Sequence, residues 1–244
     1  MPPTRIVGAV VLVAALVPAA AARAAEPSAN PPGMKQLSDE RTFSRWAYPG
    51  NHGKVRSRPA AGARTVARLH WLTEDKLPEI YLALASWRDA HGTTWVKVRL
   101  PKRPNGVTGW VPRGALRTYT LVRTFLDIDR THLRATLYSA GKPVMSTRVG
   151  IGTSSNPTPR GNFYIREKFP VRGVAAYGPY AMGTSAYAPH LTDWPGGGVV
   201  GMHGTNEPGL IPGRPSHGCI RLRNASISRL YRLTPRGTPI HIHD

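Results

Sequence analysis

Residues 216–221 of the chain read Ser-His-Gly-Cys-Ile-Arg, and residues 202–205 read Met-His-Gly-Thr. The first stretch holds Cys219, the only cysteine among 244 residues. A thiolate is a strong nucleophile, but a free thiol is mostly protonated near neutral pH and needs a base or a nearby positive charge. These two stretches supply such groups, so Cys219 is the candidate nucleophile.

Two histidines are candidates for the base beside Cys219. His203 lies upstream, far enough for an intervening loop to return its imidazole to the sulfur, and His217 is two positions away. Gly218 lets the main chain turn tightly because it has no Cβ. Successive main-chain N–H groups aimed at one point are a common way to stabilise a tetrahedral oxyanion.

Two simpler interpretations of the cysteine compete with catalysis. A lone cysteine is most often a small buried hydrophobe. Alternatively, His203, His217 and Cys219 could supply three ligands to a zinc ion, but no fourth ligand has suggestive spacing. The Ser-His-Gly-Cys setting favours the nucleophile, and we expect neither a cofactor nor a metal at this site.

This pattern resembles the signature of the L,D-transpeptidase catalytic domain, also called the YkuD domain. The resemblance joins His203 to residues 216–221 at the expected separation. It extends upstream through residues 149–152 (Val-Gly-Ile-Gly) and 158–163 (Thr-Pro-Arg-Gly-Asn-Phe), and downstream to residues 237–240 (Gly-Thr-Pro-Ile).

The resemblance implies a peptidoglycan-crosslinking enzyme. Cys219 would attack the carbonyl of the third residue of a tetrapeptide stem, release the terminal D-alanine and form a thioester that an amine of a neighbouring stem resolves. His203 would be the general base, held by the main-chain carbonyl of Gly204. The N–H groups of Gly218 and Cys219 would form the oxyanion hole, in a loop that Ser216 and His217 support.

The reaction outcome has alternatives. An L,D-carboxypeptidase of the same fold would resolve the thioester with water, and a non-catalytic wall-binding protein would leave the thiol idle. Arg221 stands where several transpeptidases have asparagine and can hold a carboxylate of the stem peptide with two hydrogen bonds. Tyr177 and Tyr187 fall in a long irregular stretch, residues 172–198, and could line a substrate groove or simply pack.

The start of the chain predicts export. Residues 1–24 have a positive n-region at Arg5, an apolar run and small residues suited to cleavage, so we interpret them as a signal peptide. A retained anchor is the alternative, although the apolar run is shorter than the ~20 residues that a spanning helix needs. We expect the protein in the cell wall, the periplasm or the extracellular space, where a single cysteine has no internal disulfide partner.

The composition is strongly basic, with 33 Lys and Arg against 13 Asp and Glu, a formal net charge of +20. Such a charge suits nucleic acid, an anionic membrane or an acidic wall polymer, or it is simply a solvated surface. Export and the lack of interleaved aromatic residues argue against nucleic acid. We expect peptidoglycan stem peptides and wall polymer as partners, and no stable membrane insertion after cleavage.

Two domains are expected after a linker at residues 25–51, which carries a short strand near Phe43–Tyr48. Residues 52–117 have alternating strands and resemble a bacterial SH3-like module that would bind wall polymer. Residues 118–244 form the catalytic domain. The predicted fold is therefore mainly β: a small SH3-like β-barrel, then an L,D-transpeptidase-like β-sandwich with a short helix.

The last elements of the chain are a helix and a strand. Asn224 is a plausible N-cap for a helix that places Ile227, Leu230 and Tyr231 on one face. Residues 238–243 alternate as a closing strand, on which His241 and His243 share a face. Exposure to solvent is the simpler interpretation of this histidine pair, and a two-histidine metal site is the alternative.

Overall fold

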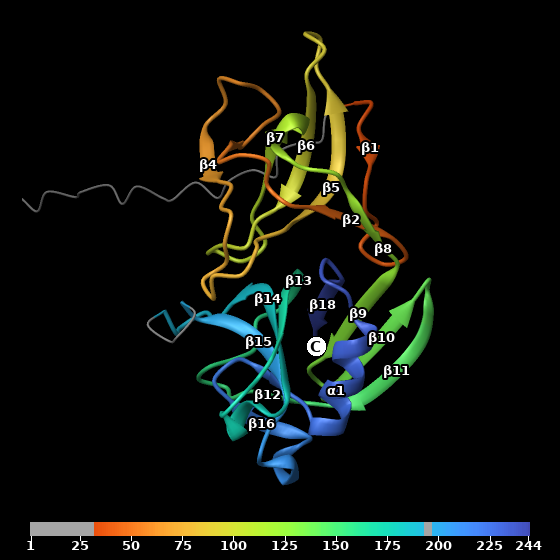
Figure 1. Cartoon of the computed structure of the whole chain (residues 1–244), viewed down its shortest axis with the longest axis vertical. Helices are drawn as coiled ribbons and strands as arrows, with labels where there is room; N and C mark the ends of the chain where they lie inside the picture. Colours follow the sequence, from red (N-terminus) through yellow and green to blue (C-terminus); the bar gives the residue numbers. More distant parts are fainter. Residues whose placement is uncertain (1–31, 193–196) are drawn as a thin grey trace, which may run out of the picture.

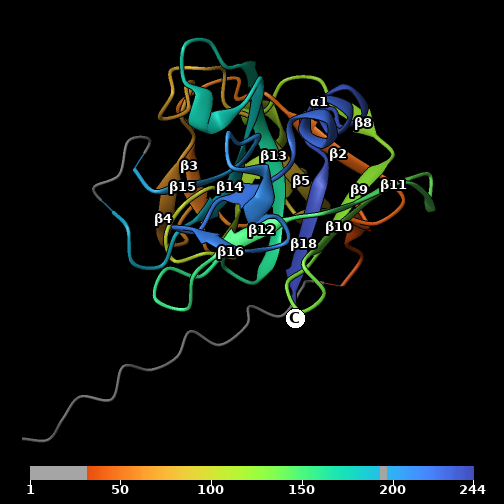
Figure 2. The ribbon, with the colours of Figure 1, turned by 90° about the horizontal axis from the view of Figure 1, so that it is seen from below.

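The computed structural model describes residues 32–192 and 197–244, which form two β-sheets and one α-helix (Figure 1). The N-terminal sheet has eight strands and the C-terminal sheet has ten, so the described chain is mainly β, as predicted. The two sheets follow one another along the long axis in Figure 1, and the N-terminal sheet lies behind the C-terminal sheet in Figure 2. The predicted signal peptide lies outside the described residues.

The N-terminal sheet is antiparallel, in the order β4-β3-β7-β6-β5-β2-β8, with β1 paired to β5. Its strands are β1 (Lys35–Gln36), β2 (Ser44–Ala47), β3 (Lys54–Arg56), β4 (Thr65–Arg68), β5 (Tyr81–Arg88), β6 (Thr94–Arg99), β7 (Thr108–Pro112) and β8 (Thr120–Val122). Val96 and Val98 of β6 are fully buried with Ala83 of β5. These apolar side chains recur at every second position, the period of a strand with one face in a core.

The boundaries of the N-terminal unit differ from the expected ones. The predicted linker contributes β1 and β2, and β2 pairs with both β5 and β8. The boundary between the two sheets lies after residue 117, because β8 ends at Val122 in the N-terminal sheet and β9 begins at Thr124 in the C-terminal sheet. Alternation reports one buried face but not which sheet buries it, so the sequence could not place this boundary.

The C-terminal sheet is mixed, in the order β11-β10-β9-β18-β13-β14-β15-β17-β12-β16. Its strands are β9 (Thr124–Asp129), β10 (Arg134–Ser139), β11 (Lys142–Arg148), β12 (Gly150–Gly152), β13 (Gly161–Pro170), β14 (Tyr180–Tyr187), β15 (Val199–His203), β16 (Gly213–Ser216), β17 (Ile220–Arg221) and β18 (Pro239–His243). Three short 3-10 helices connect strands at Arg113–Ala115, Ala175–Tyr177 and Pro208–Leu210. The sheet curls around one apolar core, so the predicted sandwich takes the form of a half-barrel.

Helix α1 (Asn224–Leu233) packs against the curled sheet. Ile227 and Leu230 are buried in the sheet's core, and the ring of Tyr231 stacks on Tyr180 of β14 with centroids 4.3 Å apart. The predicted helix and its apolar face are therefore confirmed. No helix in the described ranges is long and apolar enough to span a bilayer.

Residues 172–198 are less irregular than their composition suggested. Strand β14 occupies Tyr180–Tyr187 and lies in the middle of the C-terminal sheet, between β13 and β15. The side chains of residues 181–187 are all buried. A strand buried on both faces has no alternation of apolar and polar residues, which explains why the sequence pattern did not reveal it.

The two sheets share a buried interface. The Tyr164 hydroxyl of β13 donates to the Ile80 carbonyl at 2.8 Å, and both side chains belong to one apolar cluster with Trp46. The guanidinium of Arg166 forms a buried ion pair with Glu79, a residue just before β5. Buried charges require such pairing, so each sheet completes the interior of the other.

Candidate active site

Cys219 and His203 lie where two cavities meet. The first, named here the loop cavity, has a volume of about 230 Å³ and includes Ala188 and Gly198 of the β14–β15 connection in its wall. The second, the carboxylate cavity, has a volume of about 270 Å³ and includes Glu167 in its wall. Four residues line both cavities: Tyr177, Val199, His203 and Cys219. Both cavities therefore border Cys219 and His203.

Strand pairing brings the histidine and the cysteine together. His203 is the last residue of β15, and Cys219 directly precedes β17. These two strands are parallel neighbours, with Met202 opposite Ile220. The main-chain N–H of Gly201 points at the Cys219 sulfur, with nitrogen and sulfur 3.4 Å apart. The fold thus places two residues side by side that lie 16 positions apart in the sequence.

The imidazole of His203 is held in its neutral form. Its Nδ1 lies 2.7 Å from the carbonyl oxygen of Gly204, which can only accept, so Nδ1 carries the proton and Nε2 carries the lone pair. Burial lowers the pKa of His203 to about 4, against the opposing effect of the Gly204 carbonyl, and the charge of Arg221 lowers it further. The ring of Tyr177 packs edge-on against the imidazole, with centroids 4.5 Å apart.

The thiol of Cys219 is also neutral at rest. Burial raises its pKa above the ordinary value, while the Gly201 N–H and the positive charge of Arg221 act in the opposite direction. With the pKa of His203 lowered and that of Cys219 raised, a thiol next to a neutral imidazole is the stable form at neutral pH. The arrangement suits proton transfer during nucleophilic attack rather than a preformed thiolate.

Gly204 packs too closely for any side chain. A Cβ there would lie 2.3 Å from the Asn224 side-chain oxygen and 2.9 Å from Gly178 Cα. The same Asn224 oxygen accepts a hydrogen bond from the Thr205 N–H at 2.9 Å. Asn224 therefore anchors the chain after His203 instead of capping α1, for which Arg223 is the N-cap residue and no side-chain cap bond forms.

The loop before Cys219 is fixed from inside. Gly218 has φ of +122°, a conformation that residues with a Cβ rarely adopt. Its N–H donates to the Ser216 hydroxyl at 3.2 Å, and that hydroxyl donates to the Cys219 carbonyl at 2.6 Å. Thr158 donates to the Gly218 carbonyl at 2.7 Å. The Gly218 N–H is thus used within the loop, which differs from the expectation that it serves the oxyanion hole.

The two other predicted residues of this region line the loop cavity. His217 is exposed at its rim. Arg221 of β17 pairs with Glu207, with Nη1 and the carboxylate oxygen 3.2 Å apart. The Nε of Arg221 is buried and has no hydrogen-bond partner among the described residues. A donor left over beside a cavity can bind an anionic group, so this position suits a substrate carboxylate.

The two predicted tyrosines have different positions. Tyr177 lines both cavities, as expected for a substrate-groove residue. Tyr187, the last residue of β14, is buried and lines neither of these cavities. Its hydroxyl donates to Glu74 and contacts the Pro101 carbonyl at 3.3 Å, so it belongs to the interface between the sheets.

Two carboxyl groups at the site had no signal in the sequence. Glu167 of β13 is 2% exposed and accepts a hydrogen bond from the Thr73 hydroxyl at 2.5 Å. Burial raises the pKa of Glu167 to about 7, and the neighbouring Asp75 carboxyl raises it as well. Asp75 comes from the N-terminal unit, so the carboxylate cavity is built by both halves of the chain. Only the packing of the two sheets brings these acids to Cys219.

The N-terminal unit also holds the wall of the loop cavity. Arg103, in the β6–β7 loop, donates to three carbonyls of the β14–β15 connection: Ala188 (3.2 Å), Leu191 (2.8 Å) and Gly197 (2.9 Å). Asn105 makes a reciprocal pair with the main chain of Tyr187, with distances of 2.8 and 2.9 Å. The sequence did not single out either residue, because both lie outside the catalytic motifs.

Comparison with known proteins gives concordant matches. The profile of the YkuD family, the L,D-transpeptidase catalytic domain, matches residues 123–242. The YkuD protein of Bacillus licheniformis is 31% identical over 106 residues, and that of Bacillus subtilis is 32% identical over 108 residues. Each alignment covers 43% of this chain and 57% of the relative, so the chain spans little more than half the length of these relatives.

Solved structures are also similar. The L,D-transpeptidase from Mycobacterium smegmatis superposes with a TM-score of 0.42 and 15% identity, covering 80% of this chain and 96% of that one. The family match includes the complete motif around Cys219 and the strand that ends at His203. Residues 123–242 of this chain are therefore an L,D-transpeptidase catalytic domain of the YkuD family.

Proposed function

We propose that this protein is an L,D-transpeptidase that crosslinks peptidoglycan stem peptides through a thioester on Cys219, with His203 as general base. The observation that supports this function is the position of the pair at the junction of two cavities. Transpeptidation needs a donor and an acceptor at one sulfur, and two approaches provide for both. Hydrolysis would need room for only one peptide and water.

The first half-reaction uses the neutral pair. As Sγ of Cys219 attacks the carbonyl carbon of the donor, the thiol proton moves to Nε2 of His203, a C–S bond forms and the carbonyl electrons move to oxygen. The tetrahedral intermediate then expels the terminal D-alanine amine, which takes the proton from the imidazolium. The products are a thioester on Cys219 and free D-alanine, and His203 is neutral again.

The second half-reaction requires an amine. An acceptor amine is mostly protonated near neutral pH and attacks only after it loses a proton. The carboxyl groups of Glu167 and Asp75 favour a cationic group in the carboxylate cavity, and a Glu167 pKa of about 7 suits it to take up a proton there. We therefore assign the carboxylate cavity to the acceptor and the loop cavity, with Arg221, to the donor.

The direct test is incubation of the purified protein with disaccharide-tetrapeptide, followed by mass spectrometry. Crosslinked dimers together with released D-alanine are expected for the wild type, and neither product for Cys219→Ala. Tripeptide without dimers would instead identify an L,D-carboxypeptidase. No turnover by a folded wild-type protein would favour a wall-binding protein without catalysis.

The setting of this activity is part of the proposal. Residues 1–24 are proposed to direct export, and the N-terminal unit is proposed to be an SH3-like module that binds anionic wall polymer through its basic surface. Identification of the mature N-terminus by mass spectrometry, together with cell fractionation, tests export. Sedimentation with insoluble peptidoglycan at low and high salt tests binding, because exposed charges are largely screened beyond ~10 Å at 0.1 M salt.

A further inference from the structure

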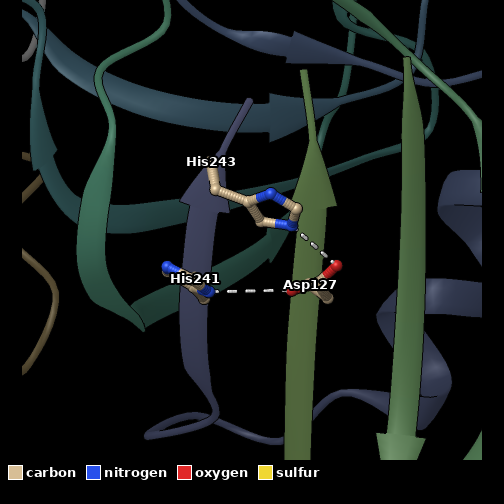
Figure 3. Close-up of side chains that lie close together, drawn as sticks. All are labelled: Asp127, His241 and His243. Carbon is tan, nitrogen blue, oxygen red and sulfur yellow. Dashed lines mark hydrogen bonds and ion pairs between the residues drawn. The ribbon is translucent and has the colours of Figure 1, made fainter. Parts of the chain in front are cut away.

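A cluster of two histidines and one aspartate lies on the outer face of the C-terminal sheet. Strands β9 and β18 are parallel neighbours, with His241 opposite Asp127. His243 is two residues further along β18 and therefore points to the same face. Figure 3 shows the three side chains converging over the two strands. One nitrogen of each histidine and one carboxylate oxygen all lie within 4.8 Å of one another.

The hydrogen bonds of His243 turn a lone pair toward the carboxylate. Its Nδ1 lies 2.9 Å from the main-chain oxygen of Asp244, which only accepts, so Nδ1 carries the proton. In the neutral ring, Nε2 then has a lone pair, and this atom is 3.1 Å from Oδ2 of Asp127. Two electron-pair donors at this distance need a positive centre between them, which is either a second proton or a metal ion.

His241 brings a second imidazole to the same cluster. Nη2 of Arg41 lies 3.3 Å from its Nδ1, and an arginine can only donate, so this nitrogen also has a lone pair. The same nitrogen is 3.8 Å from Oδ1 of Asp127. Arg41 itself rests on the ring of Phe125, 4.7 Å from its centroid. The lone pair of His241 Nδ1 therefore accepts from Arg41 in this structure, and a metal ion would take the place of the guanidinium at that nitrogen.

We propose that Asp127, His241 and His243 bind a borderline divalent transition metal ion, of which Zn²⁺ is the natural probe. Two imidazoles and one carboxylate suit zinc, whereas calcium and magnesium prefer oxygen ligands. Tetrahedral zinc with ligand distances near 2.1 Å needs ligand atoms about 3.4 Å apart. The widest pair must therefore close by roughly 1.4 Å or less. Side chains that are 23% to 34% exposed have the freedom to do so.

The nearby charged groups define the controls. Asp129, on the same face of β9, is already engaged by the N–H and Nδ1 of His132, each 2.7 Å from a carboxylate oxygen. Because His132 engages Asp129, which lies opposite His243, removing His132 would free another carboxylate beside the cluster. Arg41 competes with the ion for Nδ1 of His241. His91, exposed between β5 and β6 of the N-terminal unit, is the control histidine. Removing His91 should leave binding unchanged, and removing Arg41 should strengthen it.

The experiment is calorimetric titration of Zn²⁺ into the full chain, without a polyhistidine tag and in a Cys219→Ala background. That background removes the other strong zinc ligand near His203, so the titration reports the outer face. One ion per chain is expected. The affinity for Zn²⁺ should fall more than about tenfold in His243→Ala and in Asp127→Asn. Even the loss of a residue that only hydrogen-bonds to a metal ligand typically lowers metal affinity by that factor. Arg41→Ala should bind at least as tightly as the parent, and His91→Ala should bind as tightly as the parent.

Two outcomes would overturn the proposal. No 1:1 binding in the parent would mean that a proton on His243 alone bridges it to Asp127. Equal affinities for the parent, His243→Ala and Asp127→Asn would place the ion elsewhere. The visible absorption of added Co²⁺ gives a second readout, because a spectrum that persists in Asp127→Asn would exclude the carboxylate as a ligand. Thermal unfolding without metal confirms that each variant is folded.

Discussion

Arg103 of the N-terminal unit donates a hydrogen bond to the carbonyl of Leu191, 2.8 Å away, and Leu191 is part of the wall of the loop cavity beside Cys219. The same guanidinium also lies over the ring of Tyr187, 4.7 Å from its centroid. The N-terminal sheet is therefore a structural part of the candidate active site.

This relationship predicts that Arg103→Ala lowers kcat/KM by about tenfold or more, because a wall displaced by 1 Å misplaces the donor. Steady-state kinetics on a soluble tetrapeptide measure the effect, and we expect it in KM more than in kcat. Arg103→Lys should restore little of the lost kcat/KM, since a single ammonium group cannot reproduce the geometry in which the guanidinium binds three carbonyls. Arg64, exposed on the same unit, provides the matched control. A fully active, folded Arg103→Ala would remove the positioning role.

The second prediction concerns the acidic limb of the pH profile. Since burial lowers the pKa of His203 to about 4, the base stays neutral well below the ordinary value of 6.5. On acidification, kcat/KM should stay level to near pH 5 and fall around pH 4. Kinetics over this range, with activity remeasured after return to neutral pH to exclude denaturation, test it. A limb near 6.5 would contradict a buried, neutral His203 as the base.

The third prediction concerns Glu167, whose pKa is raised from 4.5 to about 7 in the folded protein. Between these values the folded state holds a proton that the unfolded state releases, so the free energy of unfolding falls as pH rises. The total loss attributable to this group is about 3 kcal/mol. Glu167→Gln cannot ionise and should lack this loss, measured as the difference between two urea-unfolding series.

A matched variant separates the two carboxyl groups of that cavity. Asp75 raises the pKa of Glu167, so Asp75→Asn should move the pH window to lower values without abolishing it. If the carboxylate cavity receives the acceptor, both variants should lose crosslinked dimers more than they lose D-alanine release. Parallel loss of both products would show that these carboxyl groups do not act on the acceptor step.

The fourth prediction concerns the buried ion pair between the sheets. Glu79→Gln leaves the buried Arg166 cation with Glu74, 3.0 Å away, as its remaining anionic partner. Removing one member of a buried pair typically costs 3–5 kcal/mol, and Glu74 places the expected cost at the lower end. We expect a loss of about 3 kcal/mol in the free energy of unfolding, measured by urea titration. Arg160→Ala, which breaks an exposed ion pair with Asp244, should cost less than about 1 kcal/mol. Equal losses of unfolding free energy in Glu79→Gln and Arg160→Ala would mean that the buried ion pair does not stabilise the interface between the sheets.

The fourth prediction also changes how the N-terminal unit can be studied. Deleting residues 52–117 would remove Glu79 and Thr73, the partners of Arg166 and Glu167. A truncated protein would bury or expose these groups without partners, so lost activity would not distinguish targeting from folding. Substitutions on the exposed basic surface are the cleaner test of wall binding.

Local chemistry determined what the sequence revealed. A unique cysteine in Ser-His-Gly-Cys, a remote histidine and Gly218 indicate the candidate reactive group and its turn, because each depends on residue type and spacing along the chain. The same holds for α1, whose apolar residues recur at the helical period, and for β6, whose buried valines alternate. The family match covers residues 123–242, which include Cys219, His203 and α1. The prediction of a mainly β fold needed only the alternation of apolar and polar residues along the strands.

Only the tertiary structure decided which distant residues meet. Strand β14 is buried on both faces and shows no alternation, so its central place escaped the sequence pattern. Asp75, Arg103 and Glu167 become part of the site because the N-terminal sheet packs against the curled sheet. The lowered pKa of His203 depends on the burial of its imidazole, which is set by the packing of distant segments and not by the sequence motif. Sequence periodicity shows which face of a single helix or strand is buried. Cavities and shifted pKa values depend on several segments that are distant in the sequence and packed together in the fold.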